Sequence, residues 1–163
     1  MADPVAQRPN FGEGYEAAAD APFDPPPWST VAARLAAARN YWLTTVRSDG
    51  RPHAMPVWGL WRDDTLWFGT GPVSVKGRNL ARDPRAVAHL ESGDDVVVVE
   101  GTVELLPDEL ATDQGFLDEY GEKYDLRPTA DFMLGAAWRL TPVTVLAWDE
   151  RTFVDSQVRY RFD

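Results

Sequence analysis

The sequence contains no cysteine, and this absence excludes several kinds of site at once. Without cysteine the chain forms no disulfide, offers no thiolate to a metal and has no cysteine nucleophile. It also has no apolar run near the ~20 residues that a membrane-spanning helix needs. The first ten residues, MADPVAQRPN, show no basic segment followed by an apolar one, so we expect no secretory signal and a cytoplasmic protein.

Positive charge is scarce. Lys and Arg total 16 against 26 Asp and Glu, which gives a net charge of −10 at pH 7, and Lys76 and Lys123 are the only two lysines. So large a negative charge disfavours nucleic acids and anionic membrane surfaces as partners. Lys76, Arg78, Arg82 and Arg85 nevertheless follow one another closely, with Asp83 as the only acidic residue between them. The charge therefore argues against polyanions but leaves room for one small phosphorylated ligand.

Length and composition predict a single domain preceded by an arm. A chain of 163 residues with 44% hydrophobic residues is large enough to bury one core. Residues 1–27 are rich in proline and acidic residues, and such a segment buries too little apolar area to offset its ordering entropy. We therefore expect a mostly irregular arm at 1–27 and a single folded domain at 28–163. Phe11, Tyr15 and Phe23 could pin the arm to a surface, but its composition favours a dangling tail.

Hydrophobic periodicity predicts a mainly β fold with short helices (α+β). Helical spacing suggests a helix over Thr30–Arg39 with Ser29 as its N-cap, and a short helix over Ser74–Ala81. A longer helical stretch is expected from Pro107 to Tyr124. The expected strands are Tyr41–Val46, His53–Trp61, Leu66–Thr70, Ala86–Glu91, Val96–Leu106 and Ala137–Trp148, with Val154–Phe162 as a seventh. Pro142 marks a bulge or an edge. Six or seven mostly antiparallel strands joined by short turns predict a closed or nearly closed barrel.

The common catalytic motifs are absent from the sequence. There is no H-E-x-x-H zinc motif, no G-x-S-x-G elbow, no G-x-x-x-x-G-K-[ST] loop and no G-x-G-x-x-G fingerprint. His53 and His89 lie on different expected strands, and the alternating pattern around His89 favours a structural imidazole. No metal site is predicted. Any enzymatic activity is therefore expected to depend on a cofactor.

One segment, Gly69–Leu80, has the residues of an anion site. Glycines at a strand end are followed by a helix start carrying Ser74, Lys76, Arg78 and Asn79. Backbone N–H groups and the positive end of the helix dipole favour an anion there, and Lys76 and Asn79 share a helix face. A capped surface helix with solvated charges explains the same residues equally well, so the pattern alone leaves both interpretations open.

A second segment, Pro52–Trp61, combines a strand pattern with residues that suit a flat ring. Pro56 removes a donor from the ladder, and Gly59 permits close approach of another group. Met55, Trp58 and Trp61 offer apolar or stacking surface. Ordinary barrel packing is the simpler explanation unless this strand meets the anion site.

Several short motifs in order resemble a known group of proteins. They are Leu43–Val46, Asp49–His53, Pro56–Gly59, Ser74–Leu80, Asp83–Arg85 and Val99–Thr102. Together they resemble the flavin/deazaflavin oxidoreductase superfamily, the split β-barrel group that includes the pyridoxamine 5′-phosphate oxidase-like proteins. The resemblance covers roughly Val31–Trp148.

The resemblance implies a homodimer that binds two flavin-type cofactors in clefts at its interface. It implies a cofactor phosphate on Ser74–Asn79, with Lys76 as its main ligand, and a ring against Met55–Gly59 and Thr70–Gly71. The partner chain is expected to cover the ring from Trp148 or from Val158–Phe162. The expected cofactor-binding residues are Ser74, Lys76, Arg78, Asn79, Met55, Val57, Trp58, Gly59, Thr70, Gly71 and Trp148. His53 is the one candidate proton donor, if the cleft reaches it.

The leading hypothesis is an oxidoreductase that transfers hydride between a bound deazaflavin, coenzyme F420, or FMN and a small organic substrate. Coenzyme F420 is preferred because the Lys-poor, Ala/Arg/Asp-rich composition resembles that of high-GC actinobacteria. Vitamin B6 oxidation is not expected, since the chain lacks the Arg-rich substrate-phosphate motif of the true pyridoxamine 5′-phosphate oxidases. The alternatives are a non-catalytic carrier of a flavin or haem on the same barrel, and an empty cleft. The latter stays open because some relatives carry a second basic residue where this chain has Ser74.

Overall fold

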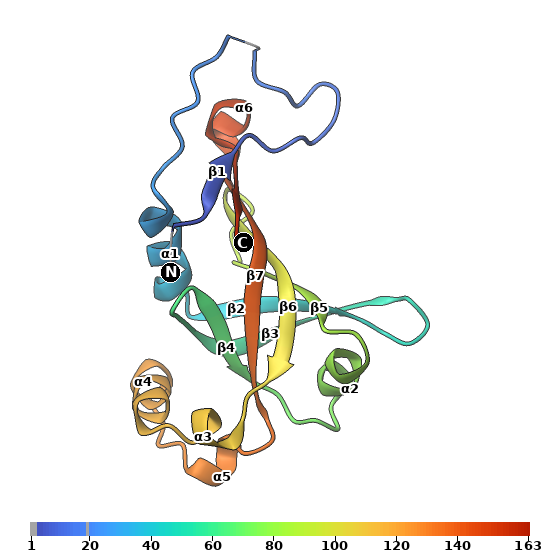
Figure 1. Cartoon of the computed structure of the whole chain (residues 1–163), viewed down its shortest axis with the longest axis vertical. Coiled ribbons are helices and arrows are strands. Elements are labelled where there is room, and N and C mark those ends of the chain that lie inside the picture. The colour runs from blue at the N-terminus through green and yellow to red at the C-terminus, as the bar shows by residue number, and fades with distance from the viewer. Residues whose placement is uncertain (1–2, 19) are drawn as a thin grey trace.

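The backbone forms a closed barrel of six antiparallel strands (Figure 1). The computed structural model describes residues 3–18 and 20–163. Around the barrel the strands follow the order β4-β3-β2-β5-β6-β7, and β7 pairs with β4 to close the ring. They are β2 (Asn40–Val46), β3 (Pro52–Arg62), β4 (Thr65–Gly69), β5 (Arg85–His89), β6 (Asp95–Leu105) and β7 (Ala137–Asp149). The predicted mainly β split barrel is therefore confirmed.

The longest strand, β7, has two different partners along one edge. Its first residues, Ala137–Leu140, pair with β4, whereas Thr144–Ala147 pair with β8 (Val158–Arg161). Its other edge pairs with β6 along nearly the whole strand. Because β8 also pairs with β1 (Val5–Gln7), the barrel continues beyond its rim as a short two-stranded extension.

A bulge interrupts the pairing of β6 with β7. Glu100 lies opposite Thr144, but the next residue, Gly101, lies opposite Pro142. One extra residue therefore sits on β7, which is the defining feature of a β-bulge. Proline has no N–H to give to a ladder, so it is tolerated at such a point. The bulge predicted at Pro142 is confirmed.

The main core lies inside the barrel and is completed by α1 (Trp28–Ala37). Trp28, Val31 and Leu35 recur at helical spacing and are at most 5% exposed. They join one cluster with the inward residues of the strands. The strand members of this cluster include Tyr41, Leu43, Val57, Leu66, Phe68, Val97, Val99, Leu140, Val145 and Tyr160.

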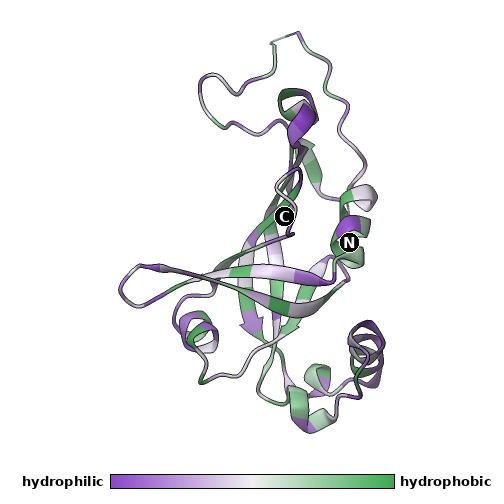
Figure 2. Cartoon of the chain, turned by 180° about the vertical axis from the view of Figure 1, so that it is seen from behind, coloured by the Kyte–Doolittle hydropathy of each residue, from purple (hydrophilic) through white to green (hydrophobic). Residues whose placement is uncertain are grey.

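A second, smaller core lies outside the barrel. It is enclosed by α3 (Asp108–Ala111), α4 (Gln114–Tyr124) and α5 (Ala130–Met133), which gather at one end of the barrel in Figure 1. Figure 2 shows that hydrophobic residues concentrate in the strands, whereas α4 is largely hydrophilic on its outer side. Among the described residues, no helix is long and apolar enough to cross a membrane.

Three predicted elements differ from the structure. The helical stretch predicted from Pro107 to Tyr124 is divided between Ala111 and Gln114 into α3 and α4. The first helix begins at Trp28, so Ser29 lies inside it and its hydroxyl caps nothing. Burial of Trp28 in the core places the helix start directly after Pro27. The predicted strand Val154–Phe162 is a strand only at β8 and follows a 3-10 turn (Glu150–Thr152) and α6 (Phe153–Ser156). Capping by Asp149, whose carboxylate accepts from the Arg151 N–H at 2.9 Å, starts that helical segment.

The N-terminal arm is irregular between β1 and α1, but it does not dangle. The pairing of β1 with β8 holds its beginning, and the Tyr160 hydroxyl donates to the Pro26 carbonyl at its end. In between, the Phe11 ring lies 5.7 Å from Trp148, and the Tyr15 ring lies 5.9 Å from Phe153. Aromatic contacts therefore hold the arm against the extension that β8 and β1 form. The composition of residues 1–27 does not by itself reveal these contacts.

Candidate functional site

The predicted anion site is a capped helix start held rigidly by its own loop. Helix α2 (Val75–Arg82) follows Ser74, whose hydroxyl accepts from the Gly77 N–H at 3.0 Å. The Thr70 hydroxyl lies 3.1 Å from the same Ser74 oxygen. At Gly77 a Cβ atom would lie 2.4 Å from the Gly71 carbonyl oxygen, so only glycine lets the helix approach the loop this closely. The N-terminus of α2 is thus fixed before any ligand arrives.

Lys76 and His53 belong to one electropositive neighbourhood at this helix start. The Arg47 guanidinium lies 3.0 Å from His53 Nδ1, and since arginine only donates, Nδ1 accepts and the ring proton is on Nε2. Partial burial lowers the pKa of His53, and the positive charges of Arg47 and then Lys76 lower it further. His53 is therefore neutral at pH 7. It can offer an N–H to an anion without carrying a charge of its own.

A cleft of about 380 Å³ separates α2 from the turn between β2 and β3. We call it the basic cleft; its lining residues are Arg47, Ser48, Asp49, Arg51, Val75, Arg78, Asn79 and Arg82. Its four arginines face a single carboxylate, Asp49, which is paired with Arg51 at 2.9 Å. Arg82 donates to the Val46 carbonyl and Arg78 to the Val73 carbonyl. These bonds fix two guanidinium groups at the cleft wall, where they provide the positive potential that a phosphate or carboxylate needs.

Asn79 is placed differently from what its position in the motif suggests. Its side chain is buried, and Nδ2 donates to the Thr45 hydroxyl at 3.0 Å. The amide therefore ties α2 to β2, although one edge of Asn79 borders the basic cleft. Of the four residues predicted to hold a phosphate, Ser74, Lys76 and Arg78 are at least partly exposed, whereas Asn79 is buried.

The predicted ring-contact residues of β3 are divided between its two faces. Val57 points into the barrel core, so it can offer a ligand only its backbone. Met55 lies on that same face but beyond the core, where it is 43% exposed. Trp58 lies on the opposite face, is 44% exposed, and stacks on Tyr124 with ring centroids 4.5 Å apart. The sequence pattern did not separate these faces.

The loop between β4 and α2 joins the strand site to the anion site. Thr70 is buried, and its carbonyl accepts from Trp138 Nε1 at 2.8 Å. Gly71 next to it is exposed, with nothing within 4 Å of where a Cβ would be. The backbone at Gly71, three residues before Ser74, is therefore open to a ligand.

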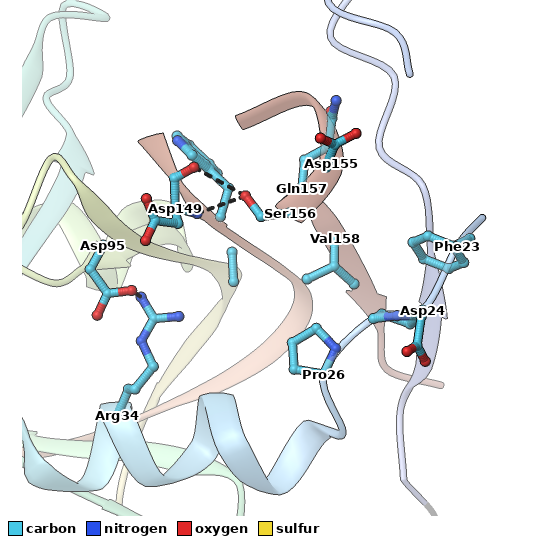
Figure 3. A pocket seen from close by; sticks show the side chains of 13 residues that line it. Phe23, Asp24, Pro26, Arg34, Asp95, Asp149, Asp155, Ser156, Gln157 and Val158 are labelled. Atoms are coloured by element: carbon cyan, nitrogen blue, oxygen red, sulfur yellow. Dashed lines mark hydrogen bonds and ion pairs between the residues drawn. The ribbon is translucent and has the colours of Figure 1, made fainter. Parts of the chain in front are cut away.

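Trp148 precedes the last residue of β7 and contacts Phe153 of α6. This end of β7 lies away from α2 within one chain (Figure 1). It borders a pocket of about 290 Å³ whose walls come from the arm, α1, β6, β7, α6 and β8. Figure 3 shows the Arg34–Asp95 ion pair of this pocket near Asp149 and Ser156. Four aspartates and one arginine line it, a charge balance that disfavours phosphate. Trp148 is thus available to the predicted ring site only from another copy of the chain.

Sequence reasoning missed Arg47 and Arg51, which turned out to face α2. They flank Ser48–Gly50, which was interpreted only as a turn. The signal was present, since two basic residues on either side of a hairpin tip project from the same end of the hairpin. Lys123 and Tyr124 were also missed; the helix α4 brings them to Gly59, some 64 positions away.

Comparison with known proteins identifies the fold. The profile of the family described as Pyridoxamine 5′-phosphate oxidase matches residues 28–154. The conserved hypothetical protein Rv2991 from Mycobacterium tuberculosis shares the fold at 24% identity and a TM-score of 0.67, covering 87% of this chain and 91% of that chain. An F420 reductase is similar at 22% identity and a TM-score of 0.55, with 69% and 93% of the two chains covered.

A heme binding protein from Mycobacterium smegmatis is also similar, at 23% identity and a TM-score of 0.55, with 77% of this chain and 59% of that chain covered. No curated protein gives a significant match. Residues 28–154 include the six barrel strands and α2, so the matched region contains the whole barrel and the helix start. This chain therefore belongs to the pyridoxamine 5′-phosphate oxidase family, within the flavin- and deazaflavin-binding split barrels.

Proposed function

We propose that this protein is an oxidoreductase that binds coenzyme F420 or FMN at α2 and β3 and transfers hydride to or from a small organic substrate. The observation that carries the proposal is the positive charge gathered along α2. Arg47 lines the basic cleft and bonds the neutral His53, and both Arg47 and Lys76 lower the pKa of His53. Serine hydroxyl, ammonium and guanidinium groups are the donors that a phosphate prefers. The donor set therefore fits the phosphate of either cofactor.

When bound, the cofactor supplies the hydride chemistry, which no side chain of this protein supplies by itself. The chain's own residues bind and orient it. Ser74 and Lys76 hold the phosphate, with Arg78 beside them. The ring is expected beside Gly71 and against the backbone of β3, with Met55 on one face of the strand and Trp58 on the other. His53 holds a proton on Nε2 and is the candidate proton donor.

The preference for coenzyme F420 rests on composition and on the fold shared with an F420 reductase. We propose further that the protein works as a homodimer in which the Trp148 side chain of one chain covers the ring held by the other. Exposed apolar residues of β3 and of the loop before α2, among them Met55, Trp58 and Val73, support such a contact. A second chain would also exclude water from the ring.

Cofactor titration tests the proposal. Purified protein is titrated with FMN and with coenzyme F420, and binding is followed by quenching of cofactor fluorescence. We expect a Kd at or below the micromolar range for at least one of them, and no binding to either contradicts the proposal. The reduced complex is then offered a panel of quinones, enones and nitro compounds. Reoxidation by a member of the panel supports an enzyme, whereas a bound, reducible cofactor that none of them reoxidises supports a carrier.

Haem binding is tested in parallel, because a carrier of haem is the alternative on this fold. Haemin is added to the same protein and its absorption band is recorded. A shifted, saturable haem band without flavin or F420 binding would favour the carrier and contradict the oxidoreductase.

A further inference from the structure

The end of α4 binds the backbone of β3 where the ladder with β2 stops. Asn40 opposite Trp58 is the last residue pair of that ladder. At the next residue of β3, Gly59, the N–H donates to the Tyr124 hydroxyl at 2.7 Å, and the carbonyl accepts from Lys123 Nζ at 2.7 Å. The adjacent side chains of Lys123 and Tyr124 thus bond both backbone groups of Gly59, in place of the β2 residue that is missing from the ladder at this position.

The number of protons available in this network gives Tyr124 and Lys123 different roles. The Tyr124 hydroxyl accepts from the Gly59 N–H and has one proton to donate. Two carbonyls are in reach, that of Arg39 at 2.6 Å and that of Gly59 at 2.9 Å. Because Lys123 supplies a donor to the Gly59 carbonyl, the Tyr124 proton is left for Arg39. Without Lys123, one hydroxyl proton would have to serve two carbonyls.

Lys123 occupies a position that is unusual for a lysine. The side chain is half-buried, and Nζ lies 5.1 Å from the centre of the Tyr41 ring and 5.6 Å from that of Tyr124. Within the described part of the chain it forms no salt bridge to a carboxylate, and the nearby charge of Arg39 is also positive. Burial, and then Arg39, lower its pKa to about 8. The ammonium is therefore held by the Gly59 carbonyl, by the Tyr41 hydroxyl at 3.4 Å and by the two aromatic rings.

The same network fixes Trp58. Its indole stacks on the Tyr124 ring with an interplanar angle of 5°, and Tyr124 is held by its bonds to Gly59 and Arg39. On the far side, Gly59 packs so tightly on β4 that a Cβ would lie 2.7 Å from the Trp67 carbonyl oxygen. Strand β3 is thus clamped at Trp58–Gly59 between α4 and β4.

We infer that Lys123 is a positioning residue for the cofactor ring: by holding the Gly59 carbonyl, it fixes the Trp58–Gly59 segment against which the ring lies. This inference rests on the proposed function, since it needs a ring at β3. Lys123 touches neither the phosphate site nor the basic cleft. Its effect should therefore fall on the ring and spare the phosphate, and this difference separates positioning from general stability.

Variants at Lys123 test this difference. Lys123→Met removes the donor and keeps the length of the chain, Lys123→Arg keeps a cationic donor, and Arg127→Met is a matched control at an exposed cation nearby. We expect Lys123→Met to weaken FMN or F420 binding about tenfold and to move the absorption band of the bound ring toward that of the free cofactor. Its affinity for inorganic phosphate should stay unchanged. Lys123→Arg should recover most of the affinity, and Arg127→Met should behave as the wild type.

The outcomes separate the two proposals. If the wild type binds a cofactor and Lys123→Met binds it equally well with the same spectrum, the role of Lys123 is refuted while the proposed function stands. Equal losses of phosphate and cofactor affinity would indicate a merely structural role and also refute it. If the wild type binds neither cofactor, both proposals fall together.

A second measurement uses the wild type, so it gives a result even if the Lys123 variants fail to fold. The chain has only two lysines, so protein labelled with carbon-13 at lysine Cε gives two NMR signals, assigned with Lys76→Ala. We expect the Lys76 signal to move with inorganic phosphate and with FMN. The Lys123 signal should move with FMN only. A Lys123 signal that ignores bound FMN contradicts the inference.

Discussion

The Arg47 guanidinium donates to His53 Nδ1 across 3.0 Å and thereby keeps the imidazole proton on Nε2. This bond links the hairpin turn to the predicted phosphate site. It also fixes the protonation state of the one histidine near that site, because a neutral ring is needed to accept it. Two of the predictions below depend on this arrangement of positive charge around Lys76.

The first prediction concerns pH. Burial, Arg47 and Lys76 all lower the pKa of His53, whereas an anion bound beside Lys76 favours the charged ring and raises it. Binding therefore takes up a proton below about pH 7, and the affinity of the wild type for FMN should rise as the pH falls. At each pH the affinity of the wild type is divided by that of His53→Gln, because the titration of FMN itself affects both proteins and cancels in this ratio. A ratio that stays flat on acidification would place His53 outside the site.

The free protein should respond to acid in the opposite direction. Because the folded chain holds His53 with a lowered pKa, the unfolded chain binds this proton more readily. The free energy of unfolding should therefore fall as the pH drops through the ordinary pKa of histidine. Thermal unfolding of the wild type and of His53→Gln at several pH values shows the difference, which should be largest at the acid end.

The second prediction concerns Lys76. If its ammonium makes a charged hydrogen bond to the phosphate, Lys76→Ala should weaken cofactor binding by about 1.5–3 kcal/mol. The loss should be equal for inorganic phosphate, since the contact does not involve the ring. Arg85→Ala is the control, because this exposed arginine lies outside the basic cleft and is paired with Asp83 at 2.7 Å. Unchanged affinity of Lys76→Ala would remove Lys76 from the site.

The third prediction separates Asn79 from its neighbours on α2. Its buried amide bonds Thr45, so Asn79→Ala leaves a cavity and a buried hydroxyl that loses a partner. We expect the free energy of unfolding to fall by about 1–3 kcal/mol, while phosphate affinity changes less than in Lys76→Ala. Chemical denaturation and phosphate titration of both variants check this. A stable Asn79→Ala with lost phosphate binding would instead make Asn79 a ligand.

Local chemistry explains which parts of the site the sequence could predict. Ser74, Gly77 and Lys76 lie within four positions, so helix capping and the charge at the helix start follow from the sequence alone. The barrel was predictable for a similar reason, because period-two patterns and turn residues mark six strands, and short turns make β2–β3–β4 and β5–β6 antiparallel neighbours. The pairing of β2 with β5 and of β7 with β4 follows from no short connection. The division into an arm at 1–27 and a domain at 28–163 remains a prediction.

The unpredicted parts depend on contacts between distant residues. Arg47 meets α2 only because the hairpin projects toward it, and Lys123 reaches Gly59 only because α4 packs on the second core. No spacing rule encodes such contacts. The face of β3 on which the Val57 side chain lies was also hard to predict, because a shift of one residue in strand register moves every side chain to the opposite face of the sheet. The predicted metal-free chemistry and the cofactor identity are questions of ligand binding, which the fold does not answer.

The fourth prediction concerns Gly59. Its Cβ position would lie 2.7 Å from the Trp67 carbonyl oxygen and 2.9 Å from Leu66 Cδ1. The backbone oxygen belongs to the β3–β4 ladder and cannot move freely, so Gly59→Ala should lower the free energy of unfolding by about 1–3 kcal/mol. Gly93→Ala is the control, since nothing lies within 4 Å of that position. Equal stability of the two variants would show that β3 and β4 are less tightly packed than the distances indicate.

The fifth prediction tests whether the site is completed by a second chain. Lys76 and Trp148 lie at separate places in one chain, so a shared site needs Lys76 of one protomer and Trp148 of its partner. Lys76→Ala and Trp148→Ala should each bind cofactor poorly as pure proteins. After the two are mixed in equal amounts and exchange subunits, a mixed dimer has one intact site and one that lacks both residues. Random exchange then restores about a quarter of the sites. Recovery of cofactor binding near that level supports the shared site. No recovery, in a sample in which native mass spectrometry detects the mixed dimer, would mean that Trp148 does not act across the interface.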